Sequence, residues 1–147
     1  MGQKLRSGYT TGTCASAAAK AAAMFLMEGK VSEQVKVCLG NGTWAEFVPE
    51  SVKTGESILE GDGWWRVKKD AGDDPDVTDG AWIYGRVLPV KEQHWERLCL
   101  EGKGYLLEEY PGIYLNGGPG IGIAAKEGLP CLKGHYAINP VPCRMIL

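Results

Sequence analysis

The sequence predicts an α+β fold, in which an alanine-rich helix packs on a mainly antiparallel β-sheet and long loops rich in glycine and aspartate join the elements. Three observations predict it: an alanine-rich run of helical length near the start, short alternating segments typical of strands, and strong loop signals between them. The 147 residues suit one domain, so residues 1–147 are expected to form a single α+β domain.

The helix is predicted over residues 13–28. Alanine has the highest intrinsic helix propensity and dominates this run. Thr13 is the expected N-cap, and Gly29 stands where a glycine commonly ends a helix. Because most side chains here are small, the backbone of another element can approach this helix closely.

Strands are predicted where apolar and polar residues alternate, at residues 35–39, 43–48, 64–68, 81–87 and 110–115. Asn41-Gly42 between the first two predicts a hairpin with a type I′ turn. Trp64 and Trp65 should lie on opposite faces, one ring in the core and one outside. Residues 137–144 are expected to be extended, since two prolines oppose a helix there.

Composition excludes several classes of protein. The formal net charge is -2, which provides no basic surface for nucleic acid. No apolar run reaches the length of a membrane span, and the first residues lack the apolar core of a secretory signal. Five cysteines, with no C-x-x-C pair, predict a reduced cytoplasmic chain without a structural metal. The apolar ending of the sequence suggests part of a longer protein.

Threonines gather at the predicted start of the helix. Thr10, Thr11 and Thr13 offer hydroxyls beside free backbone N–H groups, and a helix N-terminus attracts carboxylates and phosphates. Lys20, two turns further on, would add a cation if it faced the same side. The alternative is ordinary capping of the helix, and both interpretations stay open.

Acidic residues crowd the loop that follows residue 68. Five of them fall within ten positions: Asp70, Asp73, Asp74, Asp76 and Asp79. Such a cluster can hold a proton or attract a metal ion, an ammonium or a sulfonium. Asp and Pro are also natural turn residues, so a solvated turn remains the alternative.

A glycine run occupies residues 117–122. It matches neither the dinucleotide-binding pattern nor a P-loop. Its glycines are expected to let the backbone approach a bulky ligand or to bend a strand.

Four strings together resemble the CbiD family of cobalamin biosynthesis. They are, in order along the chain, Gly8–Ala15, Lys69–Thr78, Gly117–Gly122 and Ala137–Pro142. The family pattern commonly has other residues at three positions, which are Asp79, Pro119 and Cys143. Family members are longer, and the chain resembles their N-terminal half.

The resemblance implies an S-adenosylmethionine-dependent methyltransferase that converts cobalt-precorrin-5B to cobalt-precorrin-6A by methylating C-1. The alternative is a non-catalytic tetrapyrrole-binding half that needs its C-terminal domain. The expected roles are catalysis by Asp73 and Asp74, substrate binding by Thr10, Thr11, Thr13 and Lys20, and donor binding by Gly117, Gly118 and Gly120.

Overall fold

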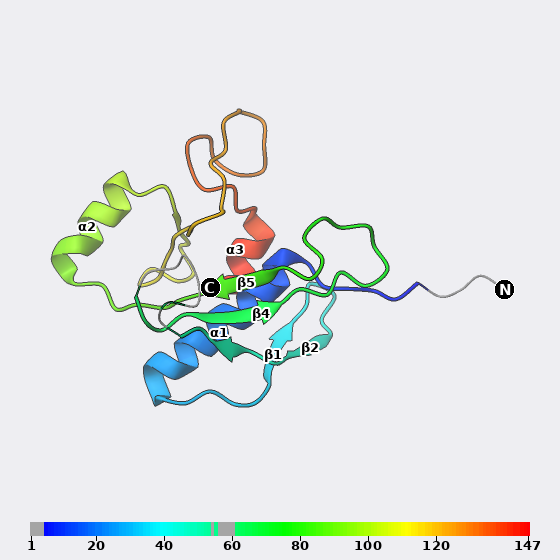
Figure 1. Cartoon of the computed structure of the whole chain (residues 1–147). Helices are drawn as coiled ribbons and strands as arrows, with labels where there is room; N and C mark the ends of the chain where they lie inside the picture. The colour runs from blue at the N-terminus through cyan, green and yellow to red at the C-terminus, as the bar shows by residue number, and fades with distance from the viewer. Residues whose placement is uncertain (1–4, 54, 56–60) are drawn as a thin grey trace. The chain divides into compact units, whose positions relative to one another are not determined.

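The computed structural model describes residues 5–53, 55 and 61–147, and they fall into two compact units (Figure 1). One comprises residues 1–87 with Ile146, and the other residues 88–145 with Leu147. Both contain helix and antiparallel strands, so the predicted α+β class is confirmed. That residues 1–147 behave as a single domain stays a prediction.

Helix α1, Thr11–Glu28, is the predicted alanine-rich helix. The prediction of Thr13 as its N-cap is wrong. Thr10 has extended backbone (φ -75°, ψ 161°), and its Oγ1 accepts the N–H of Thr13 at 3.1 Å, so the cap lies three residues earlier. Gly29 ends the helix in the left-handed conformation with φ 71°, as predicted.

The buried face of α1 consists of small side chains. Ala17, Ala18 and Ala21 are fully buried, and α1 packs against β1, β4 and β5. A Cβ atom on Gly85 of β5 would lie 2.6 Å from the backbone nitrogen of Ala19. The close backbone approach predicted for this helix is therefore confirmed at Gly85.

Strands β1 (Val35–Cys38) and β2 (Trp44–Phe47) form the predicted antiparallel hairpin. The prediction of a type I′ turn between them is wrong. Leu39 N–H donates to Thr43 O, and Gly42 N–H donates to Leu39 O, which makes a three-residue loop. Only Gly42 has positive φ there, at 83°, whereas a type I′ turn needs positive φ at both central residues. The Asn41 side chain accepts the N–H of Thr43.

Strands β3 (Glu50–Ser51), β4 (Trp65–Lys68) and β5 (Trp82–Gly85) form an antiparallel sheet in that order. Alternate residues of β4 point to opposite faces. The Trp65 ring lies 5.8 Å from the Phe25 ring of α1. Trp64 and Trp65 are both half-buried, so the expected division into one core ring and one outside ring is not observed.

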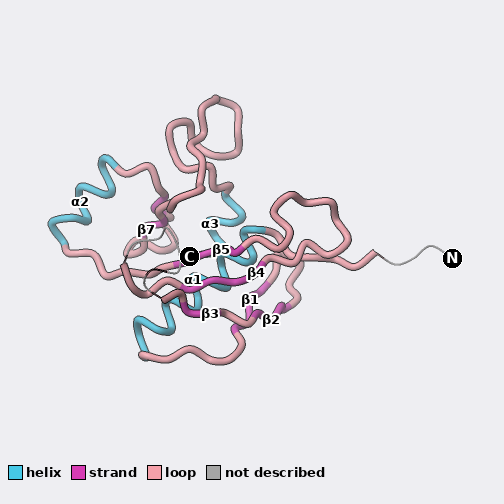
Figure 2. The backbone as a smooth tube through the Cα atoms, in the orientation of Figure 1, coloured by secondary structure: helices cyan, strands magenta, loops and turns pink. Residues whose placement is uncertain are grey.

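In the second unit, loops join short elements (Figure 2). Helix α2, Glu92–Glu101, was not predicted. Strand β6, Tyr105–Leu106, pairs with β7, Tyr114–Leu115. Of the strand predicted at residues 110–115, only the two residues of β7 form a strand.

Helix α3, Pro140–Ile146, contradicts the predicted extended ending. Pro140 and Pro142 both fall in its first turn, where a backbone N–H has no acceptor within the helix. The prolines therefore cost the helix no hydrogen bond, and they favour its start. Among the described residues, no helix is both long and apolar enough to cross a bilayer.

Candidate functional site

The N-terminal segment and the aspartate loop lie side by side, although more than sixty positions separate them. Tyr9 N–H donates to Asp70 O at 2.8 Å, and Asp73 N–H donates to Arg6 O at 2.9 Å. Ser7 and Gly72 form an antiparallel bridge between these hydrogen bonds. The threonine turn and the aspartate loop are thus parts of one structure.

Two glycines permit this close pairing. A Cβ atom on Gly8 would overlap the backbone of Ala71 and Gly72. Gly72 has φ 67°, and a Cβ atom on it would overlap the backbone of residues 6–8. A side chain at either position would push the two segments apart.

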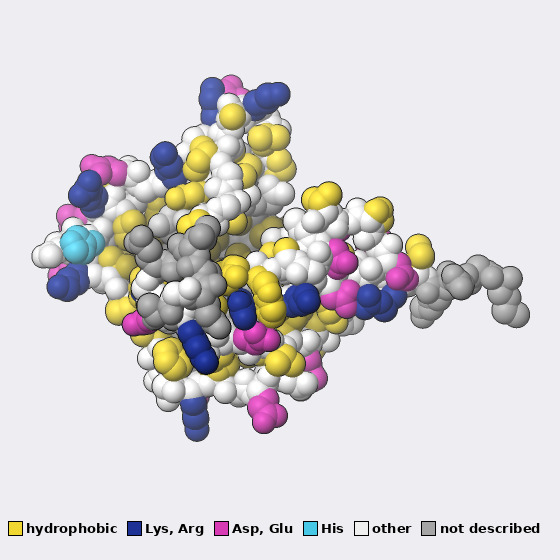
Figure 3. Space-filling model, viewed as in Figure 1, with side chains coloured by type: hydrophobic (Ala, Val, Ile, Leu, Met, Phe, Trp, Pro, Cys, Tyr) yellow, Lys and Arg dark blue, Asp and Glu magenta, His cyan; other side chains and the backbone are white. Residues whose placement is uncertain are grey.

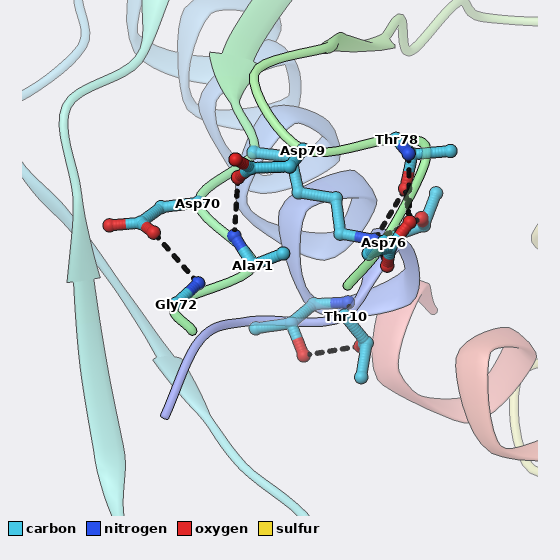
Figure 4. A network of polar contacts seen from close by, with 10 residues as sticks. Thr10, Asp70, Ala71, Gly72, Asp76, Thr78 and Asp79 are labelled. Carbon is cyan, nitrogen blue, oxygen red and sulfur yellow. Dashed lines mark hydrogen bonds and ion pairs between the residues drawn. The ribbon is translucent and has the colours of Figure 1, made fainter. Parts of the chain in front are cut away.

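Lys69 holds the loop to the start of α1. Figure 4 shows the loop residues Asp76 and Thr78 near Thr10 at the start of the helix. Its side chain is 3% exposed. The ammonium donates to Thr11 Oγ1 at 3.1 Å, to Asp76 Oδ2 at 2.6 Å and to Thr78 Oγ1 at 2.6 Å. Hydrogen bonds from Lys69 and Thr78 hold the pKa of Asp76 well below its usual range. The cation that these residues bind is therefore the chain's own ammonium.

Three other aspartates of the loop have local partners. Asp70 forms an ion pair with Arg6 at 2.6 Å, which lowers the pKa of that carboxyl, and accepts Gly72 N–H at 2.9 Å. Asp73 Oδ2 accepts Arg6 N–H at 2.6 Å, and Asp79 accepts the N–H of Ala71 at 2.9 Å. Local hydrogen bonding thus accounts for most of the cluster.

Asp74 is different. Its side chain is exposed and, within the described residues, its carboxylate has no hydrogen-bond or ion-pair partner. In the same part of the chain, no three side chains of His, Cys, Asp or Glu cluster as metal ligands would. Of the two predicted catalytic aspartates, Asp73 has one carboxylate oxygen bonded to Arg6 N–H, whereas both oxygens of Asp74 are available to another molecule.

The threonines have separate tasks at the helix start. Thr10 Oγ1 accepts Thr13 N–H and lies 2.9 Å from Thr13 Oγ1, and Thr13 is buried. Thr11 is exposed, and its hydroxyl oxygen accepts from Lys69. The N–H groups of Thr11 and Gly12 have no acceptor among the described residues. These two N–H groups can receive an anion.

Lys20, the fourth predicted substrate-binding residue, does not lie near the N–H groups of Thr11 and Gly12. It lies nine positions after Thr11, about 13 Å along the helix axis. Its ammonium donates to the backbone oxygen of Lys36 in β1 at 2.7 Å.

Cys14 follows the threonines but is not a nucleophile. It is fully buried, and burial raises the pKa of its thiol to about 11. The thiol therefore stays protonated at neutral pH.

Sequence reasoning missed Lys69 as a member of the site. The signal was available in the alternation of β4, where Val67 is buried, Lys68 is exposed and Lys69 is buried again. A lysine at an inward position, followed by aspartates, predicts an internal ion pair.

The glycine run lies in the second unit. Ile121 N–H donates to Gly118 O at 3.1 Å, and Gly120 has φ 89°, so a turn with Pro119 and Gly120 at its centre forms here. A Cβ atom on Gly117 would overlap the Tyr136 ring. The backbone next to Gly117 is thus occupied by the chain's own tyrosine, which does not fit an open cradle for a methyl donor. Donor binding by Gly117, Gly118 and Gly120 stays a prediction.

The CbiD family model matches residues 1–147. The chain belongs to the CbiD family. Relatives named cobalt-precorrin-5B C(1)-methyltransferase include those of Geobacillus sp. (42% identical, 97% of this chain and 33% of the relative) and Rubrobacter xylanophilus (46% identical, 99% and 33%). Thermosipho africanus has another, 41% identical over 99% of this chain and 35% of the relative.

The CbiD chain therefore spans about a third of the length of these curated relatives, rather than the expected half. No solved structure matches it.

Proposed function

We propose that this CbiD chain binds the substrate and contributes catalytic residues in a cytoplasmic S-adenosylmethionine-dependent methyltransferase that methylates C-1 of cobalt-precorrin-5B and gives cobalt-precorrin-6A. The names of the relatives support the reaction class. The observation that carries the proposal is the Lys69 contact, which joins the exposed Thr11 to the aspartate loop in one polar site.

Substrate carboxylates bind at the start of α1. The acetate and propionate arms of a precorrin are anions, and the N–H groups of Thr11 and Gly12 are unpaired donors at the positive end of the helix dipole. Lys69 donates to Thr11 Oγ1 and leaves the hydroxyl proton of Thr11 free to donate outward. Three donors at the start of the helix are thus available to a carboxylate.

The Asp74 carboxylate attracts the positive charge of the methyl donor, whereas the start of α1 attracts the negative charges of the substrate. When bound, the methyl donor supplies a methyl group on a positively charged sulfur. An unpaired carboxylate in the loop that Lys69 joins to Thr11 favours a cation in its neighbourhood. Asp73 keeps its place by accepting the N–H of Arg6, so the catalytic role proposed for this pair belongs mainly to Asp74.

A second candidate function is a tetrapyrrole-binding part without activity of its own. The packing of Tyr136 against Gly117 favours it, because the segment predicted to bind the donor is filled by the chain itself. The donor would then be bound by the remaining two thirds of the length seen in relatives.

Two measurements separate these functions. The full-length protein is incubated with cobalt-precorrin-5B and S-adenosylmethionine labelled on its methyl group, and transfer of the label to the tetrapyrrole is measured. Labelled product supports the reaction, and its absence from an intact, folded protein contradicts it. Equilibrium dialysis of residues 1–147 with labelled S-adenosylmethionine then tests the binding-only alternative, which expects no retention.

A further inference from the structure

The face of the β3–β4–β5 sheet opposite α1 combines cationic and aromatic side chains. In the register of β4 and β5, Arg66 lies opposite Tyr84 and Lys68 lies opposite Trp82. Alternation places these four side chains on one face, while Trp65 and Val67 point to the face that α1 covers. We call Arg66, Lys68, Trp82 and Tyr84 the cationic-aromatic face.

Contacts across the two strands fix its geometry. The Arg66 guanidinium lies 4.2 Å from the centre of the Trp82 ring, and the Lys68 ammonium lies 5.9 Å from the same centre. Glu50 of β3 pairs with Arg66 at 3.2 Å and holds the guanidinium from its other side. The guanidinium is thus stacked on the half-buried Trp82 ring, and together they form a flat surface that carries positive charge.

Charge is not balanced on this face. Lys68 is exposed and, among the described residues, has no carboxylate partner. Glu50 offsets one of the two positive charges, so the face keeps a positive charge on a chain whose formal net charge is -2. Figure 3 shows basic, hydrophobic and acidic side chains together over β4 and β5.

The face leads directly into the aspartate loop. Beyond the Lys68–Trp82 pair, Lys69 N–H donates to Ala81 O and Gly80 N–H donates to Lys69 O, which continues the ladder into the loop. Lys68 points outward and Lys69 points inward to Thr11. One strand end therefore joins the cationic-aromatic face to the polar site.

We propose that the cationic-aromatic face binds the ring of the carboxylated tetrapyrrole, with the Arg66 guanidinium stacked between Trp82 and the macrocycle and Lys68 toward its carboxylate arms. This inference rests on the proposed function and adds where the ring lies. A planar polyanion is recognised by a flat surface and by positive charge, and a guanidinium held flat on an indole provides both in fixed geometry.

Binding of two cobalt corrins to the full-length protein tests the inference. The probes are cobyrinic acid, whose arms are free carboxylates, and cobinamide, whose arms are amides, and quenching of tryptophan fluorescence reports binding. The unsubstituted protein should prefer cobyrinic acid, and added salt should reduce that preference.

Matched variants locate the binding. Lys68→Gln should weaken cobyrinic acid binding about fivefold and leave cobinamide binding nearly unchanged, since one exposed charge contact is lost. Trp82→Leu should weaken both probes about tenfold. The controls are Lys36→Gln and Trp44→Leu, which remove an exposed lysine and an exposed tryptophan from the β1–β2 hairpin.

The outcomes distinguish the two proposals. If the unsubstituted protein binds neither corrin, the proposed function and this inference both fail. If it binds cobyrinic acid but Lys68→Gln and Trp82→Leu behave like their controls while all variants remain folded by circular dichroism, the inference alone is wrong.

Discussion

Lys69 and Thr11 are 58 positions apart, and the Lys69 ammonium lies 3.1 Å from Thr11 Oγ1. The same ammonium is held by Asp76 and Thr78 within its own loop. A single buried cation therefore ties the start of α1 to the loop between β4 and β5, and several expectations follow from this contact.

Lys69→Met should lower the free energy of unfolding by about 1–3 kcal/mol, because the three hydrogen bonds of a buried ammonium are lost. Urea denaturation measures the loss. Lys68→Met is the matched control, since it removes an exposed lysine one position earlier and should change stability by less than about 0.5 kcal/mol. Equal losses in both variants would mean that the Lys69 contacts contribute nothing specific.

Asp76 should make stability depend on acid pH. Its pKa in the folded chain lies below the ordinary value, so the ionised carboxylate stabilises the fold above about pH 4, and this contribution is lost as pH falls toward the folded-state pKa. Asp76→Asn should be less stable than the unsubstituted protein at pH 7, and the difference should shrink below pH 4.

Melting temperatures between about pH 3 and pH 7 measure this effect. Asp74→Asn removes a negative charge from the same loop without removing a hydrogen bond and serves as the control. A difference between Asp76→Asn and the unsubstituted protein that is constant over the whole range would contradict the assignment.

Thr11 and Thr10 should respond differently to replacement by valine. Thr11→Val should weaken binding of cobyrinic acid, because it removes the hydroxyl that Lys69 orients. Thr10→Val should instead lower stability by about 1 kcal/mol, since Thr10 caps α1. Thr11→Ser keeps the hydroxyl and should bind normally. If Thr11→Val also binds normally, capping is the only task of this turn.

Asp74→Asn in the full-length enzyme should reduce turnover at least tenfold, about 1.4 kcal/mol of transition-state stabilisation, with little change in melting temperature. Asp73→Asn should lower turnover less and the melting temperature more than Asp74→Asn, because an amide oxygen accepts the N–H of Arg6 more weakly than a carboxylate does. Steady-state kinetics with circular dichroism measures the two effects. Normal turnover in Asp74→Asn would mean that the loop has a structural role only.

Gly85→Ala should destabilise the protein by about 1–3 kcal/mol, since a Cβ atom would meet the backbone of Ala18 and Ala19 in α1. Gly40→Ala, where a Cβ atom meets nothing within 4 Å, is the control. Thermal unfolding of the two variants measures the difference. Similar melting temperatures would show that α1 and β5 can separate slightly without cost.

The sequence by itself determined the elements whose signals are local. The alanine-rich helix, its glycine end and the strand pairs around residues 35–47 and 65–85 follow from propensity and alternation. It missed Thr10 as the cap because three threonines compete within four positions, and it missed α3 because prolines oppose a helix everywhere except in its first turn.

Tertiary structure decided what the polar residues do. Five aspartates in one loop predict an available acidic cluster, whereas in the fold Arg6, Lys69 and nearby N–H groups occupy four of them and leave Asp74. These partners lie far from the loop in sequence or depend on its exact turns, so no local pattern specifies them. A buried ammonium without hydrogen-bond acceptors is costly, so Lys69 needs acceptors from other parts of the chain. The packing of α1 against β4 and β5 places one of them, Thr11, next to Lys69.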